Sequence, residues 1–145
     1  MSRFKRLQPV KQLADDKADA AARELAAAQQ RLGEQEQRLR QLQEFRAQYQ
    51  QQRVDSGGNG MDGFRLRDFN AFIGRLDQAI SHQQRLIAQS LADVERLQRL
   101  WTEQLRHAKA IDKVVARCAA DERRAEERRA QRETDAFAQV RRPQP

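Results

Sequence analysis

The chain has 145 residues, of which 34% are Asp, Glu, Lys or Arg and 39% are apolar. This length allows one domain, and the scarcity of Gly and Pro beside abundant Ala, Glu, Gln, Leu and Arg favours long helices over a globular core. A helical rod buries a seam and offers no substrate pocket, so the composition argues against an enzyme. The net charge of +7 favours an acidic protein surface, a nucleic acid or anionic lipid as a partner.

The basic excess is unevenly distributed. Residues 1–54 sum to +4, residues 55–100 to zero and residues 101–145 to +3. Acidic residues interleave with the basic ones throughout, which weakens the prediction of a nucleic-acid partner. The alternative is that the arginines only solvate a helix surface.

The sequence predicts a cytoplasmic protein. Cys118 is the single cysteine, so no internal disulfide forms and a reducing compartment is expected. No window approaches the ~18 apolar residues of a membrane span. The basic start of the chain lacks the apolar stretch of a secretory signal.

A heptad repeat with Phe4 at position a runs through the first half of the chain. Eleven of its fourteen a and d positions are apolar or aromatic, as a coiled-coil seam requires. These a positions are Phe4, Lys11, Ala18, Leu25, Leu32, Leu39 and Arg46, and the d positions are Leu7, Ala14, Ala21, Ala28, Gln35, Leu42 and Tyr49. The repeat predicts one helix over about residues 8–54.

A glycine cluster follows this first repeat. Residues 55–63 contain four glycines and Asn59, which adopt positive φ at little cost. A nucleotide-binding loop is excluded because no strand precedes the glycines and no Lys-Ser/Thr pair follows Gly60. The cluster predicts a turn over about residues 55–65.

A second heptad repeat starts with Leu66 at position a and stays apolar at a as far as Val115. Polar residues interrupt it only at d, at Gln83, Ser90 and Gln104, where they can set the register of the pair. The seam ends after Cys118, and the Arg- and Glu-rich residues that follow predict a solvated helix. The second helix is expected over about residues 66–138, before a disordered C-terminal tail.

The two repeats predict an all-α fold of two long helices in an antiparallel coiled-coil hairpin with a C-terminal helical extension. In a hairpin that turns near Gly60, residue i faces roughly residue 120 minus i. Phe4 then lies opposite about Val115, and residues beyond Cys118 have no partner. A parallel dimer of long helices is the main alternative, but the glycine cluster disfavours an unbroken helix.

The chain offers no catalytic or metal-binding pattern. His82 and His107 lie about seven turns apart on one predicted helix, and neither has a second metal-ligand type four residues away. The carboxylates have no cavity that could raise their pKa for acid–base work. No enzyme activity, cofactor or metal is expected.

Aromatic residues concentrate near the predicted turn. Phe45, Tyr49, Phe64, Phe69 and Phe72 lie within about thirty residues of sequence, and Phe45 and Phe72 both fall at position g. More apolar surface lies there than a two-helix seam can bury. The cluster is therefore a candidate partner-binding surface, with rings that only thicken the seam as the alternative.

The residue pattern resembles the FliJ family, the coiled-coil protein of the flagellar type III export apparatus. The resemblance covers nearly the whole chain and includes the opening Phe4-Lys5-Arg6-Leu7, the alanine-rich residues 15–23 and the Gly-Asn-Gly of residues 58–60. It also includes a closing pattern over residues 131–138, where Ala136 stands in place of the usual acidic residue. The positions around the turn that carry it are Leu42, Phe45, Tyr49, Phe69, Phe72, Ile73, Leu76, Ala79 and Ile80.

The resemblance implies two binding surfaces. The first, here called the aromatic patch, contacts the cytoplasmic region of the export-gate membrane protein and consists of Leu42, Phe45, Tyr49, Phe72, Leu76, Ala79 and Gln83. The second, here called the basic set, enters the ring of the hexameric export ATPase and consists of Arg3, Lys5, Arg6, Arg117, Arg123, Arg124, Arg128, Arg129 and Arg132.

The resemblance also implies the escort of export chaperones and a location at the cytoplasmic face of the inner membrane, at the flagellar base, without membrane insertion. The leading hypothesis is a stalk that couples the ATPase to the gate and binds no nucleic acid. The alternatives are the stalk of a non-flagellar type III secretion system, a basic helical hairpin that binds nucleic acid, and a generic coiled-coil adaptor. The sequence does not identify the chaperones or the oligomeric state.

Overall fold

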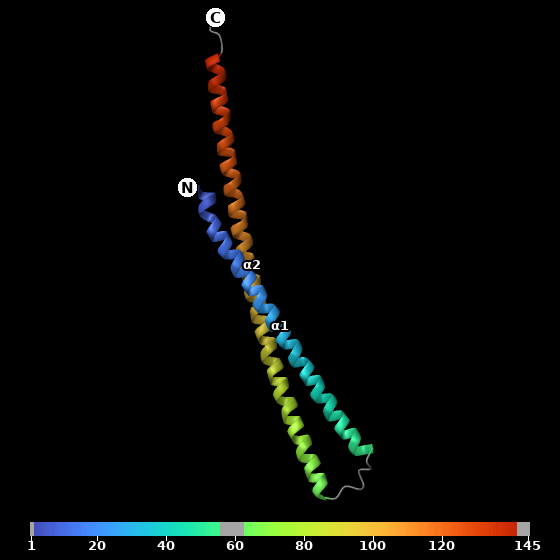
Figure 1. The fold of residues 1–145 in the computed structure, drawn as a ribbon. Helices are drawn as coiled ribbons and strands as arrows, with labels where there is room; N and C mark the ends of the chain where they lie inside the picture. The colour runs from blue at the N-terminus through green and yellow to red at the C-terminus, as the bar shows by residue number, and fades with distance from the viewer. Residues whose placement is uncertain (1, 56–62, 142–145) are drawn as a thin grey trace. The chain divides into compact units, whose positions relative to one another are not determined.

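The computed structural model describes residues 2–55 and 63–141. Those residues form two α-helices, α1 (Arg3–Asp55) and α2 (Gly63–Arg141), which pack against each other in antiparallel fashion (Figure 1). The all-α helical hairpin predicted from the heptads is confirmed. Most of the predicted turn, residues 56–62, and the last four residues of the predicted tail lie outside the described residues.

Helix α1 begins earlier than residue 8, where the heptads placed its start. Ser2 caps it, because the Ser2 hydroxyl accepts a hydrogen bond from the Lys5 amide at 3.2 Å, the usual bond from the third helical residue to its cap. The Phe4 amide donates to the Glu122 carboxylate of α2 at 3.2 Å. These partners satisfy two of the N–H groups that a helix start leaves open, and they offset the hydrogen bond lost at Pro9 inside the helix.

Helix α2 is longer than predicted at both ends. It begins at Gly63 instead of 66 and ends at Arg141 instead of 138. Its pairing with α1 also passes Cys118, the predicted end of the seam, because Glu122 and Ala125 are still half-buried. The earlier start of α1 provides their partner, as the bond between Phe4 and Glu122 shows.

Burial follows the predicted heptads. Every a and d position of α1 from Phe4 to Arg53 is buried or half-buried, and the same holds in α2 from Phe69 to Ala125. Leu66, in the first turn of α2, is exposed. The period of the apolar residues therefore determines which face of each helix forms the seam.

Two compact units make up the chain. The terminal unit comprises Met1–Ala21 and Leu100–Pro145, and the middle unit comprises Ala22–Arg99. In the terminal unit the core is a cluster of Ala14, Ala18 and Ala108. Ile111 packs against this cluster of small side chains.

The middle unit buries larger side chains. Its core includes Leu25, Phe69, Leu76 and Leu97. A polar layer interrupts this core, because the buried Gln83 side chain donates to the backbone carbonyl of Gln35 at 2.9 Å. Ser90, one of the other polar d residues, donates to the Gln35 side chain in the same layer.

Beyond Ala125, α2 continues without a partner helix in the terminal unit. Residues 126–141 are all exposed, and Figure 1 shows this extension in orange and red past the start of α1. Local contacts support it: the Gln131 amide donates to Asp135 at 3.1 Å, and the Arg141 guanidinium lies 4.5 Å from the centre of the Phe137 ring. Side-chain pairs four residues apart stabilise an isolated helix in this way.

Candidate binding surfaces

The aromatic patch lies wholly in the middle unit and combines residues from both helices. Leu42, Phe45 and Tyr49 belong to α1, and its other four residues belong to α2. The side chains differ in exposure: Phe45 is 48% exposed, whereas Tyr49 and Phe72 are half-buried. The surface available to a partner is therefore centred on Phe45.

The rings of this region contact one another across the two helices. Phe45 meets Phe72 edge-on, with ring centroids 6.1 Å apart. Tyr49 stacks on Phe69 at 5.1 Å and also contacts Phe72 at 4.5 Å. The Arg53 guanidinium lies 4.5 Å from the centre of the Phe69 ring. Such ring pairs contribute beyond their buried area, so the cluster stabilises the helix pair as well as offering a surface.

Two predicted members of the aromatic patch lie in the seam. Gln83 is only 7% exposed and donates to the Gln35 carbonyl, and Leu76 is buried. Both residues therefore contribute to pairing of the helices, and neither presents much surface to a partner. Both occupy d positions, but so do the half-buried Leu42 and Tyr49, so the heptad position alone does not separate the buried members from the accessible ones.

The basic set lies wholly in the terminal unit, and all nine of its side chains are exposed. Three of them, Arg124, Arg128 and Arg132, follow one another at four-residue spacing on α2, so they share one helix face. Arg124 precedes the extension, and the other two lie on it. Arg124 approaches Asp121 at 3.8 Å. The remaining members flank this row from the start of α1 and from elsewhere on α2.

Several residues of the basic set are unfavourable for the helices that carry them. Like charges four residues apart destabilise a helix, as Arg124, Arg128 and Arg132 do. Cations at a helix N-terminus interact unfavourably with the helix dipole. The first turn of α1 contains Arg3, Lys5 and Arg6 and has no acidic residue. Residues that break local rules without a local gain are common at functional sites.

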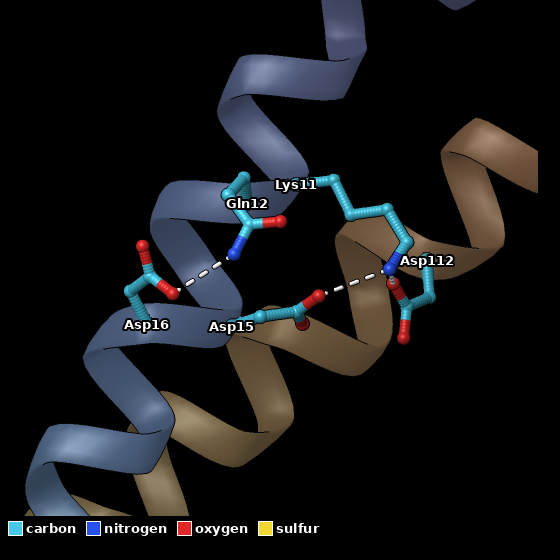
Figure 2. A network of polar contacts seen from close by, with 5 residues as sticks. All are labelled: Lys11, Gln12, Asp15, Asp16 and Asp112. Atoms are coloured by element: carbon cyan, nitrogen blue, oxygen red, sulfur yellow. Dashed lines mark hydrogen bonds and ion pairs between the residues drawn. The ribbon is translucent and has the colours of Figure 1, made fainter.

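Ion pairs between the helices occupy two of the polar a positions. Lys11 reaches Asp112 of α2 at 3.2 Å and Asp15 of its own helix at 2.9 Å, as Figure 2 shows. Arg46 contacts Asp77 of α2 at 2.6 Å. The residue numbers of each cross-helix pair add to 123, against the 120 expected from a turn near Gly60. The heptad pattern alone did not predict these pairs. A signal for them is present in the sequence, because a Lys or Arg at position a lies near an Asp on the facing helix in each pair.

The Lys11 pairs predict a pH-dependent stability. Its hydrogen bond to Asp15, and then that to Asp112, raise the pKa of the lysine above its ordinary value. A raised folded-state pKa stabilises the fold below the unfolded value, near 10.4 for Lys, and this contribution is lost as the pH rises through the folded value. We expect the melting temperature of the wild type to fall relative to that of Lys11→Met above about pH 10. Thermal unfolding of both proteins between neutral and strongly alkaline pH checks this, and a pH-independent difference would contradict it.

Surface depressions on the extension are open. One lies between Arg124, Glu127, Arg128 and Gln131, all on the same helix, and one helix encloses no substrate. Within residues 2–55 and 63–141, no three His, Cys, Asp or Glu side chains gather as a metal site. Over the same residues, neither helix has a stretch apolar enough to cross a bilayer.

Known proteins match this chain along almost its full length. The family model described as "Flagellar FliJ protein" matches residues 3–142. A flagellar FliJ protein of Salmonella typhi is 27% identical over 139 residues, which cover 96% of this chain and 95% of that protein. Both matches include the two helices and the extension.

Proposed function

The chain belongs to the FliJ family, and we propose from that premise that it is a non-enzymatic component of flagellar protein export that acts as the stalk of the export ATPase. In this proposal the basic set enters the hexameric ATPase ring, and the exposed part of the aromatic patch binds the cytoplasmic region of the export gate. The protein works in the cytoplasm, at the inner-membrane face of the flagellar base, and also escorts export chaperones.

The observation that supports ring binding best is the exposed arginine row on an unpaired helix. Arg128 and Arg132 lie four residues apart on the extension, which makes no helix pair, and Arg124 precedes them at the same spacing, so three like charges adjoin along one helix face. A lining of acidic residues in a ring would relieve this repulsion. Exposed charge pairs are individually weak and salt-sensitive, which suits a stalk that turns inside its ring.

The assignment of the two surfaces to different units supports a coupling role. The basic set belongs to the terminal unit and the aromatic patch to the middle unit, so one chain presents chemically different surfaces to two partners. The basic surface favours acidic groups, and the Phe45 surface favours an apolar pocket. An ATPase ring and a gate could thus be contacted by one molecule.

The decisive experiment mixes the purified chain with the export ATPase of the same organism and measures hexamer formation and ATP turnover. We expect both to rise with the wild type. Reversing the row with Arg124→Glu, Arg128→Glu and Arg132→Glu should weaken binding on the order of a hundredfold, at about 1 kcal/mol per charge. Raising the salt concentration should weaken wild-type binding in the same direction.

A matched control comes from the middle unit. Arg75, Arg85 and Arg99 are exposed arginines of α2 that lie outside the basic set, so reversing all three changes the net charge equally. The control should keep its stimulation of the ATPase. If both triple variants lose the stimulation of the ATPase equally, the effect is one of non-specific charge. If the wild type itself does not stimulate the ATPase, the stalk proposal is wrong and the generic coiled-coil adaptor is the remaining hypothesis.

A further inference from the structure

One face of the terminal unit combines cations with exposed aliphatic side chains from both helices. Six of the nine residues of the basic set belong to this face, here called the mixed face, whereas Lys5, Arg123 and Arg129 lie on other sides of their helices. All ten members are exposed. They are Arg3, Arg6, Val10, Leu13 and Lys17 of α1 and Val114, Arg117, Arg124, Arg128 and Arg132 of α2.

Helix geometry arranges these members in two rows. In α1 their spacings of three, four, three and four residues keep them on one side of the helix. In α2 the spacings are three, seven, four and four residues, so Val114 lies in the same row as the arginines that follow it. Arg123 points away from this row, because at 3.6 residues per turn it lies about 180° from Val114 around the helix.

The two rows lie on the same side of the helix pair. Val10 and Val114 both occupy g positions of their heptads, and the ring contact between the two g residues of the aromatic patch shows that g residues of the two helices share a side. The ion pair between Lys11 and Asp112 brings Val10 and Val114 to the same level. Val10, Leu13 and Val114 are 46%, 56% and 42% exposed, so they form an apolar patch that adjoins the arginines.

The mixed face is basic despite the carboxylates near it. Asp121 approaches Arg124 at 3.8 Å. Asp16 and Asp135 each accept a hydrogen bond from a glutamine four residues earlier, at 2.9 and 3.1 Å, as Figure 2 shows for Asp16. Seven cations against four carboxylates leave the face with a net charge of +3. The four carboxylates on the face or at its edges are Asp16, Asp121, Glu127 and Asp135.

Most cations of this face have no counter-charge within the chain. Among residues 2–55 and 63–141, only Arg124 of its seven cations takes part in an ion pair. The partner that covers the arginines must therefore supply acidic groups. Because the apolar patch continues the same row, that partner must also cover aliphatic side chains.

We propose that the ring of the export ATPase contacts the chain through the mixed face alone, and that Val10, Leu13 and Val114 pack against an apolar part of the ring beside its acidic groups. This inference rests on the proposed function and adds to it a side of contact and an apolar component. The cations guide association and weaken with salt, whereas burial of the aliphatic side chains provides affinity that salt does not screen. Val114 and Arg132 are eighteen positions apart on one helix, so the contact extends about 27 Å along α2.

Titration calorimetry of the full chain with the export ATPase tests the apolar component. Leu13→Gln should raise the dissociation constant about fivefold, at low and at high salt alike, because it removes an apolar contact. Leu13 is more than half exposed and Gln has a helix propensity close to that of Leu, so helicity should stay unchanged. Leu91→Gln is the matched control, because Leu91 is 45% exposed but lies in the middle unit, and it should bind as the wild type does.

Single charge reversals test the side of contact. Arg128 lies on the mixed face and Arg123 lies on the opposite side of the same helix, and both are exposed. At low salt, Arg128→Glu should raise the dissociation constant about fivefold more than Arg123→Glu does. This difference should shrink as the salt concentration rises.

The outcomes separate this inference from the function on which it rests. A wild type that does not bind the ATPase would overturn both. If the wild type binds but Arg123→Glu weakens binding as much as Arg128→Glu, the ring surrounds the helix and the contact through one face is wrong, while ring binding stands. If Leu13→Gln binds as tightly as the wild type, or Leu91→Gln weakens binding to the same extent as Leu13→Gln, the apolar component is wrong.

Discussion

Phe69→Ala should lower the free energy of unfolding by about 3 kcal/mol, the largest loss expected from truncating one side chain of this protein. Phe69 is only 6% exposed, stacks on Tyr49 and lies under the Arg53 guanidinium. Truncation removes the ring from the seam and leaves Tyr49 without its stacking partner. Urea unfolding followed by far-ultraviolet circular dichroism measures the loss.

Phe45→Ala is the matched control for this prediction and also tests gate binding. Phe45 is 48% exposed and contacts Phe72 only edge-on, so its truncation should cost less than about 1 kcal/mol. Binding to the cytoplasmic region of the export gate should nevertheless fall, because an exposed ring of this kind is a typical anchor. If Phe45→Ala destabilises the protein as much as Phe69→Ala does, the ring belongs to the seam and the aromatic patch loses its centre.

Ala18→Leu should lower the free energy of unfolding by about 2 to 3 kcal/mol through overpacking. Ala18 is 6% exposed and lies in the buried cluster with Ala14 and Ala108, against which Ile111 packs. A leucine forces the helices apart or adopts a strained rotamer. The alanine-rich seam is thus sensitive to added volume, whereas the Phe69 region is sensitive to lost volume.

Ala116→Leu provides the comparison in the same unit. Ala116 is exposed on α2, and Leu and Ala have similar helix propensities, so its free energy of unfolding should change by less than about 0.5 kcal/mol. Calorimetric unfolding of the wild type and both variants distinguishes them. Similar stability of Ala18→Leu and the wild type would show that the helices can separate at this point without cost.

Helix bounds show where sequence patterns lose accuracy. The first heptad contains Phe4, yet the predicted start of α1 lies near residue 8. The reason is that a heptad pattern carries no information on the hydrogen bonds that cap a helix. Ser2 and Glu122 stabilise the extra turn, and Glu122 lies 118 positions from Phe4 in the sequence. A contact between such distant residues depends on the register of the helix pair, which local propensity does not contain.

The binding surfaces show the same limit. The resemblance to the family implied the nine residues of the basic set, and the structure places all of them in one unit. The aromatic patch was predicted as one surface, but Leu76 and Gln83 lie in the seam. The family resemblance assigned residues of the helix seam and residues of the accessible surface to the same binding patch. Only their burial in the structure distinguishes the two groups.

The sequence alone determined the class of fold, the two helices and the face of each helix that forms the seam. These depend on a 3.5-residue apolar period and on a glycine cluster, and both act locally along the chain. Only the tertiary structure decided the register, with Lys11 opposite Asp112 and Arg46 opposite Asp77, and the length of the paired region. The physical reason is that coiled-coil seams are nearly equivalent under a shift of one heptad, so register is decided by pair-specific contacts between residues far apart in the sequence.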